Sequence, residues 1–162
     1  MSIFTTGIHG PAGNPSGAQG GIIQIRQTIY STDQTFSTTG SFFATGLACA
    51  ITPTSTDNHV LVFVQLTMQP QSAGILLFRV SKPNSNYLTR GVSGGGYQCT
   101  VGGTQDGSRG AYPSFHLLDT DIATTSSTNY DVQALCTSSS RINGRDTDYR
   151  GISVITLMEV SA

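Results

Sequence analysis

The chain lacks most of the charged residues that normally cover a protein surface. Only 10% of its 162 residues are charged, against roughly 25% in a typical soluble domain. Lys82 is the only lysine and Glu159 is the only glutamate. Because lysine and glutamate are common on exposed helix faces, their scarcity argues against a helical domain.

The sequence also lacks the features that mark a nucleic-acid-binding or a membrane protein. Its net charge is −1, so there is no basic excess to neutralise phosphates. No apolar run approaches the roughly 18 residues that a membrane helix needs. The N-terminus has no basic segment followed by an apolar core, which a secretory signal would have. We therefore expect no nucleic-acid partner and no membrane association.

No residue pattern of a catalytic or metal centre is present. The histidines are His9, His59 and His116, and the acids pair as Asp119 with Asp121 and Asp146 with Asp148. These histidines form no metal-ligand motif, and Asp in such segments usually forms turns. The two Asp pairs would hold calcium only if they converged. We expect no catalytic residue, no metal site and no cofactor.

Tryptophan and paired cysteines are missing as well. The absence of tryptophan removes the main aromatic residue of a carbohydrate-binding platform. The three cysteines, Cys49, Cys99 and Cys136, are odd in number and widely spaced, which is a poor disulfide framework. Since Cys49 and Cys136 lie in strand-like segments, we interpret them as small buried hydrophobic residues of a protein assembled in a reducing cytoplasm.

What the sequence does contain is a series of strand-like segments separated by turns. The segments are 21–30, 41–52, 59–68, 75–81, 111–119, 129–137 and 152–160. Most of them alternate apolar and polar residues, whereas the glycine-dense segment 82–110 predicts a long loop or short edge strands. The pattern predicts an all-β fold, an antiparallel, jelly-roll-like β-sandwich of about seven or eight strands.

Residues 1–20 differ from the rest of the chain. Glycine, proline and asparagine recur through this segment and exclude a regular element. Its apolar residues, Ile3, Phe4 and Ile8, need cover. We therefore expect an extended N-terminal arm over 1–20 that docks on neighbouring subunits, followed by a β-sandwich domain over 21–162.

The last strand is apolar on both faces. One face carries Ile152, Val154, Met158 and Val160. We expect that face to enter the core, and we expect Ile155 and Leu157 on the other face to pack against another copy of the chain in a trimer. The alternative is that the N-terminal arm folds back over them. Glu159 is placed at the edge of that oligomer interface, with Arg26 or Arg150 as a candidate partner.

Four stretches of this chain resemble a domain of virion structural proteins in tailed phages of cyanobacteria and marine bacteria. They are GGIIQIRQT, ATGLACAITPTSTDNHVLVFV, FHLLDTDIATTSSTNYDVQAL and TDYRGISVITLMEV. In that family the domain is often the C-terminal module of tail-fibre-like proteins. The resemblance implies an antiparallel β-sandwich in a homotrimeric virion component, and no catalytic residues come with it.

Two functions fit this resemblance, both in the virion after assembly in the host cytoplasm. With a short arm and no fibrous shaft before the domain, the chain fits a capsid decoration or cement protein that forms homotrimers and clasps the major capsid protein. The alternative is a short tail fibre or tail appendage, whose loops, such as 82–110, bind a receptor such as a host-surface glycan. A carbohydrate-binding module or hydrolase unrelated to virions is a third hypothesis.

Overall fold

The structure, a computed structural model, describes residues 21–37, 40–83, 88, 101–106, 112–145 and 149–162. The expected arm over 1–20 lies outside the described residues, together with Ile3, Phe4 and Ile8. Most of the segment 82–110 lies outside them as well. The described part of the chain contains no helix that could cross a membrane.

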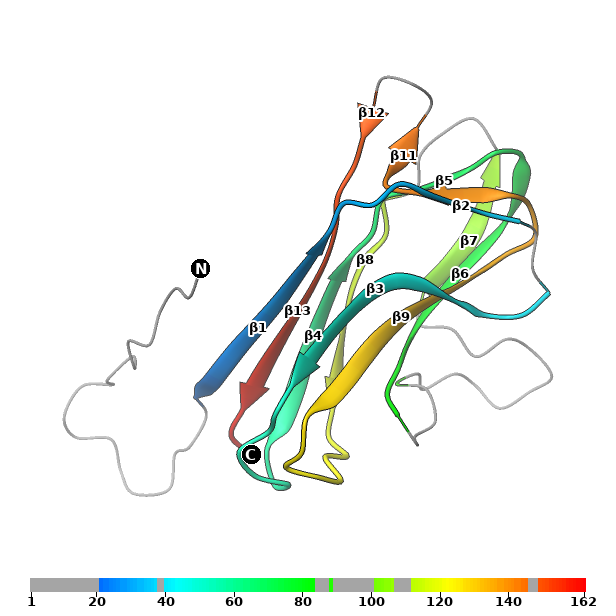
Figure 1. The fold of residues 1–162 in the computed structure, drawn as a ribbon. Coiled ribbons are helices and arrows are strands. Elements are labelled where there is room, and N and C mark those ends of the chain that lie inside the picture. Colours follow the sequence, from blue (N-terminus) through cyan, green and yellow to red (C-terminus); the bar gives the residue numbers. More distant parts are fainter. Residues whose placement is uncertain (1–20, 38–39, 84–87, 89–100, 107–111, 146–148) are drawn as a thin grey trace.

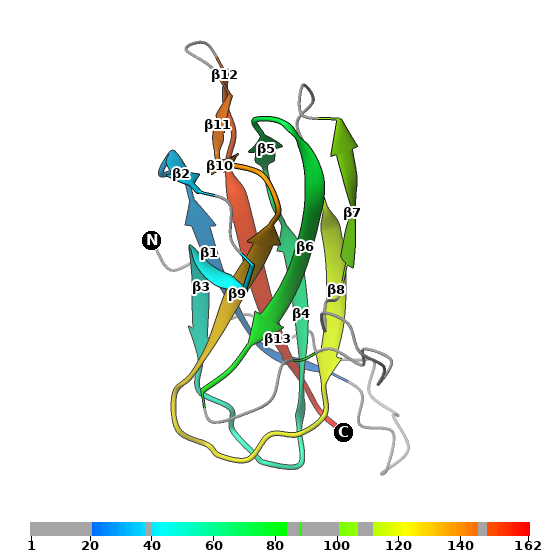
Figure 2. The same cartoon turned by 90° about the vertical axis from the view of Figure 1, so that its right-hand side faces the viewer.

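Eight strands of the described chain form two four-stranded antiparallel sheets that pack face to face (Figures 1 and 2). The first sheet has the order β1-β13-β4-β8 and the second the order β3-β9-β6-β7. Their bounds are β1 Ile22–Tyr30, β3 Phe43–Ile51, β4 His59–Gln65, β6 Ala73–Ser81, β7 Val101–Asp106, β8 Ser114–Asp119, β9 Thr128–Cys136 and β13 Ser153–Val160.

The path of the chain is that of a jelly roll. Apart from the β6–β7 hairpin, each of these eight strands lies in the opposite sheet from the strand before it. All the pairings within the two sheets are antiparallel. The expected all-β, jelly-roll-like sandwich is therefore confirmed.

Five short strands lie at the upper end of the sandwich in Figure 1. They are β2 Gln34–Phe36, β5 Met68–Pro70, β10 Ser140–Ile142, β11 Gly144–Arg145 and β12 Tyr149–Arg150. Asn143, between β10 and β11, has a φ of 57° and is fully buried. Its amide donates to the carbonyls of Tyr30 and Thr32, and its side-chain oxygen accepts from Ser153. Asn143 thus ties the end of β1 to the start of β13.

The core follows the alternation in the sequence on most strands. Its members include Leu47, Cys49 and Ile51 of β3, Val60, Val62 and Val64 of β4, Leu76, Phe78 and Val80 of β6, and Tyr130, Val132, Ala134 and Cys136 of β9. Cys49 and Cys136 are buried free thiols, as expected. Strand β3 changes register at Gly46, whose φ of 84° is a left-handed conformation that favours glycine.

The expected orientation of the last strand is wrong. Ile155 and Leu157 are fully buried in the core, and Glu159 is fully buried beside them, so they cannot form an oligomer interface. The residues expected in the core, Ile152, Val154, Met158 and Val160, point outward and are exposed or half-buried. The reason is the register with β4, in which Leu157 is paired with the core residue Val62.

Candidate functional site

The outer face of the β1-β13-β4-β8 sheet carries one row of residues that is apolar across all four strands. Residues paired across neighbouring strands point to the same face. One row, Ile25, Met158, Leu61 and Leu118, is apolar from one edge of the sheet to the other. The row beside it consists of Gln27, Thr156, Phe63 and His116, and the next of Ile29, Val154, Gln65 and Ser114. We call the outward residues of these four strands the outer face.

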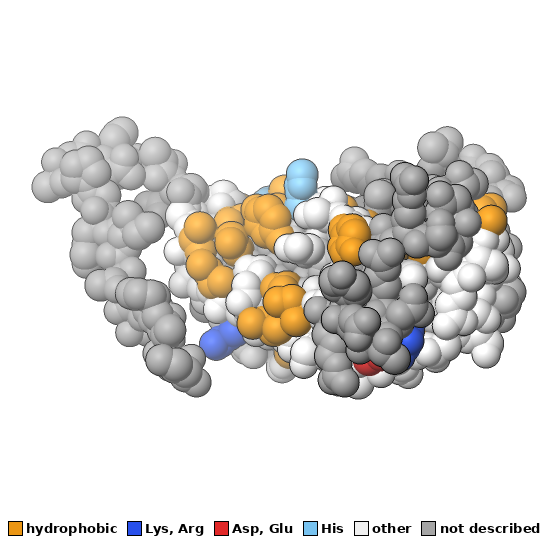
Figure 3. Space-filling view, turned by 90° about the horizontal axis from the view of Figure 1, so that it is seen from above, with side chains coloured by type: hydrophobic (Ala, Val, Ile, Leu, Met, Phe, Trp, Pro, Cys, Tyr) orange, Lys and Arg blue, Asp and Glu red, His pale blue; other side chains and the backbone are white. Residues whose placement is uncertain are grey.

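Most of the large hydrophobic residues that the described chain exposes belong to this face or its rim. They are Ile22, Ile23, Ile25, Ile29, Phe63, Leu118 and Ile152, and the exposed large hydrophobic residues elsewhere are Ile75 and Tyr112. Figure 3 shows hydrophobic side chains gathered in several clusters, with few charged groups among them, on the side where β1 lies. Monomeric proteins rarely expose apolar patches larger than a few hundred Å².

The outer face carries no Asp, Glu, Lys or Arg among the described residues of its rows. Its titratable groups are His59, which is paired with Val160, and His116, whose ring lies 6.0 Å from that of Phe63. The charged residue of β1, Arg26, alternates with the outward residues Ile25 and Gln27 and so belongs to the other face. The face therefore offers a partner apolar contact and neutral hydrogen bonds.

The outer face of the second sheet has a different character. Arg79 of β6 lies 3.8 Å from the centre of the Phe42 ring, and its Nε donates to Gln133 of β9 at 2.7 Å. The outward positions of β3 include the small residues Ala44 and Ala50, which are exposed. Its described residues are thus largely polar or small, in contrast to those of the first sheet.

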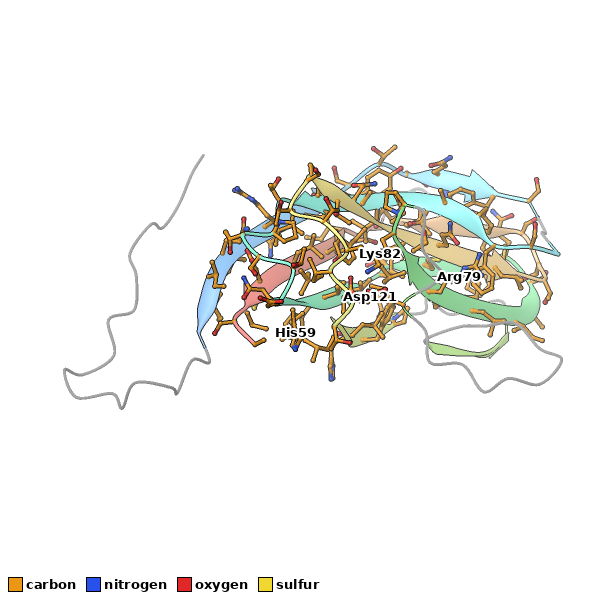
Figure 4. All side chains as sticks on the ribbon, turned by 90° about the horizontal axis from the view of Figure 1, so that it is seen from below. His59, Arg79, Lys82 and Asp121 are labelled. Carbon is orange, nitrogen blue, oxygen red and sulfur yellow. The ribbon has the colours of Figure 1, made fainter. Side chains whose placement is uncertain are left out.

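The only lysine of the chain is buried in a polar cluster at the lower end of the sandwich. Nζ of Lys82 donates to both carboxylate oxygens of Asp119, at 3.0 and 2.9 Å, and to the carbonyl of Asp121. The Tyr130 hydroxyl donates to the same carboxylate at 2.7 Å. Figure 4 shows Lys82 and Asp121 side by side at this end. The cluster joins β6, β8 and β9 through a satisfied ion pair.

Tyr130 is held in its neutral form. Burial, the hydrogen bond to Asp119 and the negative charge of that carboxylate raise the pKa of the Tyr130 hydroxyl far above its ordinary value. A tyrosine in this state donates one hydrogen bond and is a poor proton acceptor. The arrangement stabilises the ion pair and does not resemble an acid–base pair.

The only glutamate, Glu159, forms a second buried polar cluster. Its Oε2 accepts from Gln24 at 2.6 Å, and its Oε1 accepts from Asn58 at 2.6 Å and from the backbone and hydroxyl of Thr54 at 2.7 and 2.8 Å. Burial raises the pKa of the Glu159 carboxyl, but these hydrogen bonds lower it by more, so it lies below its ordinary value. Its donors among the described side chains are neutral, and Arg26, one of the two predicted arginine partners, is not one of them.

Both buried carboxylates belong to one inward row of the first sheet. Gln24 is paired with Glu159, Glu159 with Val60, and Val60 with Asp119. Each carboxylate is surrounded by donors of its own chain, which leaves neither exposed to act on a substrate. Among the described residues, no group of three or more His, Cys, Asp or Glu side chains is placed to hold a metal ion.

The structure places the predicted interface residues inside the sandwich and brings a different set of residues together on its surface. Ile155, Leu157 and Glu159 are internal, and the candidate surface consists of their outward neighbours and of β1, β4 and β8. The signal for it was present in the sequence as the apolar residues Ile25 and Ile29 of β1 and as Leu61 and Phe63, the second apolar face of β4. Sequence alone did not show that these lie on one side of one sheet.

No protein-family model matches the chain, and no curated protein matches it. The resemblance to phage virion proteins therefore rests on the four sequence stretches alone.

Proposed function

We propose that this chain is a non-enzymatic structural protein of a tailed-phage virion, a capsid decoration or cement protein that forms homotrimers. The observation that carries the proposal is the outer face of the β1-β13-β4-β8 sheet, which has no Asp, Glu, Lys or Arg in its described rows and carries an apolar row across all four strands. A folded domain with such a face gains stability when it assembles with other protein surfaces. The jelly-roll fold and the sequence resemblance support the same function.

The buried polar clusters support a structural role over an enzymatic one. The ion pair of Lys82 with Asp119 joins strands of both sheets, and Glu159 holds the start of β1 against the turn after β3. Their hydrogen bonds are made within the chain, so they contribute rigidity to a subunit that is repeated many times. Residues 1–20, with Ile3, Phe4 and Ile8, would clasp neighbouring capsid subunits and strengthen the shell by mass action.

The copy number of the chain in purified particles tests this proposal. We expect quantitative mass spectrometry to find it at a high copy number, comparable to that of the major capsid protein, in the phage that encodes it. A copy number of a few would instead assign the chain to the tail, as a receptor-binding appendage. Absence from the particles would contradict both functions.

Deletion of residues 2–20 tests the role of the arm separately. The shortened chain should stay folded and associated with its own copies, because the β-sandwich begins at β1. It should no longer join heads that lack the decoration protein. Normal incorporation of the shortened chain would show that the arm is not the clasp.

A further inference from the structure

We infer that copies of this chain associate through the outer face of the β1-β13-β4-β8 sheet, so that the occupant of this face is a second copy. The inference deepens the proposed function and rests on it for its biological setting. It replaces Ile155 and Leu157, which are in the core, with Ile25, Leu61 and Met158 as contact residues.

The size of the face suits a stable protein interface. Four strands spaced about 4.8 Å apart, with three outward residues along β8 and four along each of the others, give a plan area of roughly 500 Å². Projecting side chains make the accessible area larger than the plan area. A standard interface removes about 800 Å² of accessible surface from each partner. Contact with neighbouring copies over this face therefore buries an area of the right order.

The absence of charge favours an identical partner. Complexes between different proteins often use complementary charges to steer and select their partners. The outer face presents no Asp, Glu, Lys or Arg in its described rows, so it has no charge for such a partner to recognise. An apolar surface is complementary to another like itself, and interfaces between identical chains are the more apolar class.

The apolar row reaches both edges of the sheet. Ile25 on the edge strand β1 and Leu118 on the edge strand β8 are each 52% exposed, and Met158 and Leu61 are half-buried between them. A neighbouring copy can therefore contact apolar side chains at either edge. The row gives the contact a continuous apolar strip, and the neutral polar residues of the neighbouring row, Gln27, Thr156 and His116, can form hydrogen bonds beside it.

Sedimentation velocity of the purified chain and of single-residue variants tests the inference. We expect the unaltered chain to sediment as an oligomer. Ile25→Asp should weaken association by at least about 100-fold, because its carboxylate would be buried without a partner. Leu118→Ser repeats the test with a milder change at the other edge. Ala50→Asp, at an exposed position on β3 of the second sheet, is the matched control and should associate normally.

Circular dichroism confirms that each variant is folded before its mass is interpreted. A monomeric unaltered chain, or face variants that associate as strongly as Ala50→Asp, would overturn the inference. Particle incorporation separates this outcome from failure of the proposed function. An oligomer that depends on the outer face but is absent from virions would refute the proposed function alone. A monomer present on heads would refute the interface and the homotrimer, and would leave the place of the chain in the capsid standing.

Discussion

The two faces of the β1-β13-β4-β8 sheet differ in polarity, and the difference is the reverse of that in a typical surface sheet. The inner face includes two ionisable carboxylates, Glu159 and Asp119, each almost fully removed from solvent. The outer face has no charged residue in its described rows and exposes apolar side chains such as Ile25 and Leu118. A sheet with one solvated face normally has polar residues on that face.

The difference shows which face has all its contacts within one subunit. On the inner face, every buried carboxylate oxygen has donors from the same chain, so the face is satisfied within one subunit. On the outer face, the apolar residues lack cover among the described residues of the chain. Mutations on the inner face should therefore change folding stability, whereas those on the outer face should change association.

The largest effect on stability should come from Lys82→Ala. Removing the ammonium leaves Asp119 buried without its charge partner, which we expect to lower the free energy of unfolding by about 3–5 kcal/mol. Arg141→Ala is the matched control, because its ion pair with Asp33 is about one-third exposed. That change should cost no more than about 1 kcal/mol. Urea denaturation measures the free energy of unfolding of both variants. Equal losses in the two variants would contradict the expected difference between the buried and the exposed ion pair.

Adjacent residues of β13 compare the two faces directly. Leu157→Ala should lower the free energy of unfolding by about 2–5 kcal/mol, because it opens a cavity in the core. Met158→Ala, one residue further on, should change the stability of the isolated subunit far less and should weaken self-association instead. Denaturation at low protein concentration and sedimentation at high concentration measure the two effects. The reverse result would support the orientation of β13 that was predicted from the sequence, with Met158 in the core and Leu157 outside.

A smaller loss is expected at the contact between β1 and β3. A Cβ added at Gly46 would lie 2.7 Å from the Tyr30 hydroxyl, and its φ is left-handed. The backbone alone should cost Gly46→Ala about 1–2 kcal/mol, with displacement of Tyr30 adding to it. Gly40→Ala is the control, since no atom of the described residues beyond its chain neighbours lies within 4 Å of its added Cβ. Thermal unfolding should separate the two variants.

The smallest expected effect on the free energy of unfolding depends on pH and tests the buried carboxylate of Glu159. Because the folded pKa of Glu159 is lowered, its contribution to stability is complete above the unfolded pKa of about 4.3 and is lost as the pH falls through the folded value. Glu159→Gln should cost about 1–2 kcal/mol at neutral pH, because an amide cannot accept all of these hydrogen bonds. It should also lose part of the acid dependence. The free energy of unfolding of both proteins should be measured from pH 7 to pH 3. The same pH dependence in Glu159→Gln and in the unaltered protein would contradict this prediction.

Much of the fold could be predicted from alternation along the sequence. Alternation assigned Leu76, Phe78 and Val80 to the core because Arg79 and Ser81 fall on the opposite face. It failed on β13, where both faces are apolar and period two gives no orientation. Only the pairing of Leu157 with Val62, set by the tertiary fold, decides which side enters the core.

The buried polar clusters were beyond local sequence patterns. Glu159 receives its hydrogen bonds from Gln24, Thr54 and Asn58, all more than 100 residues earlier in the chain. Asp119 does accept a turn hydrogen bond from the backbone of Asp121, as predicted, but its bonds with Lys82 and Tyr130 were not predicted. Such clusters form only when strands distant in sequence become neighbours.

Photo-cross-linking at Phe63 tests the central claim most directly. Phe63 on the outer face and Ile75 on the second sheet are each 40% exposed, so a benzophenone side chain at either position is equally accessible. We expect the probe at Phe63 to give a covalent dimer attached through outward residues of β1, β13, β4 or β8 of another copy. The probe at Ile75 should give little. Equal yields at both positions, or no cross-linked dimer from Phe63, would contradict association through the outer face.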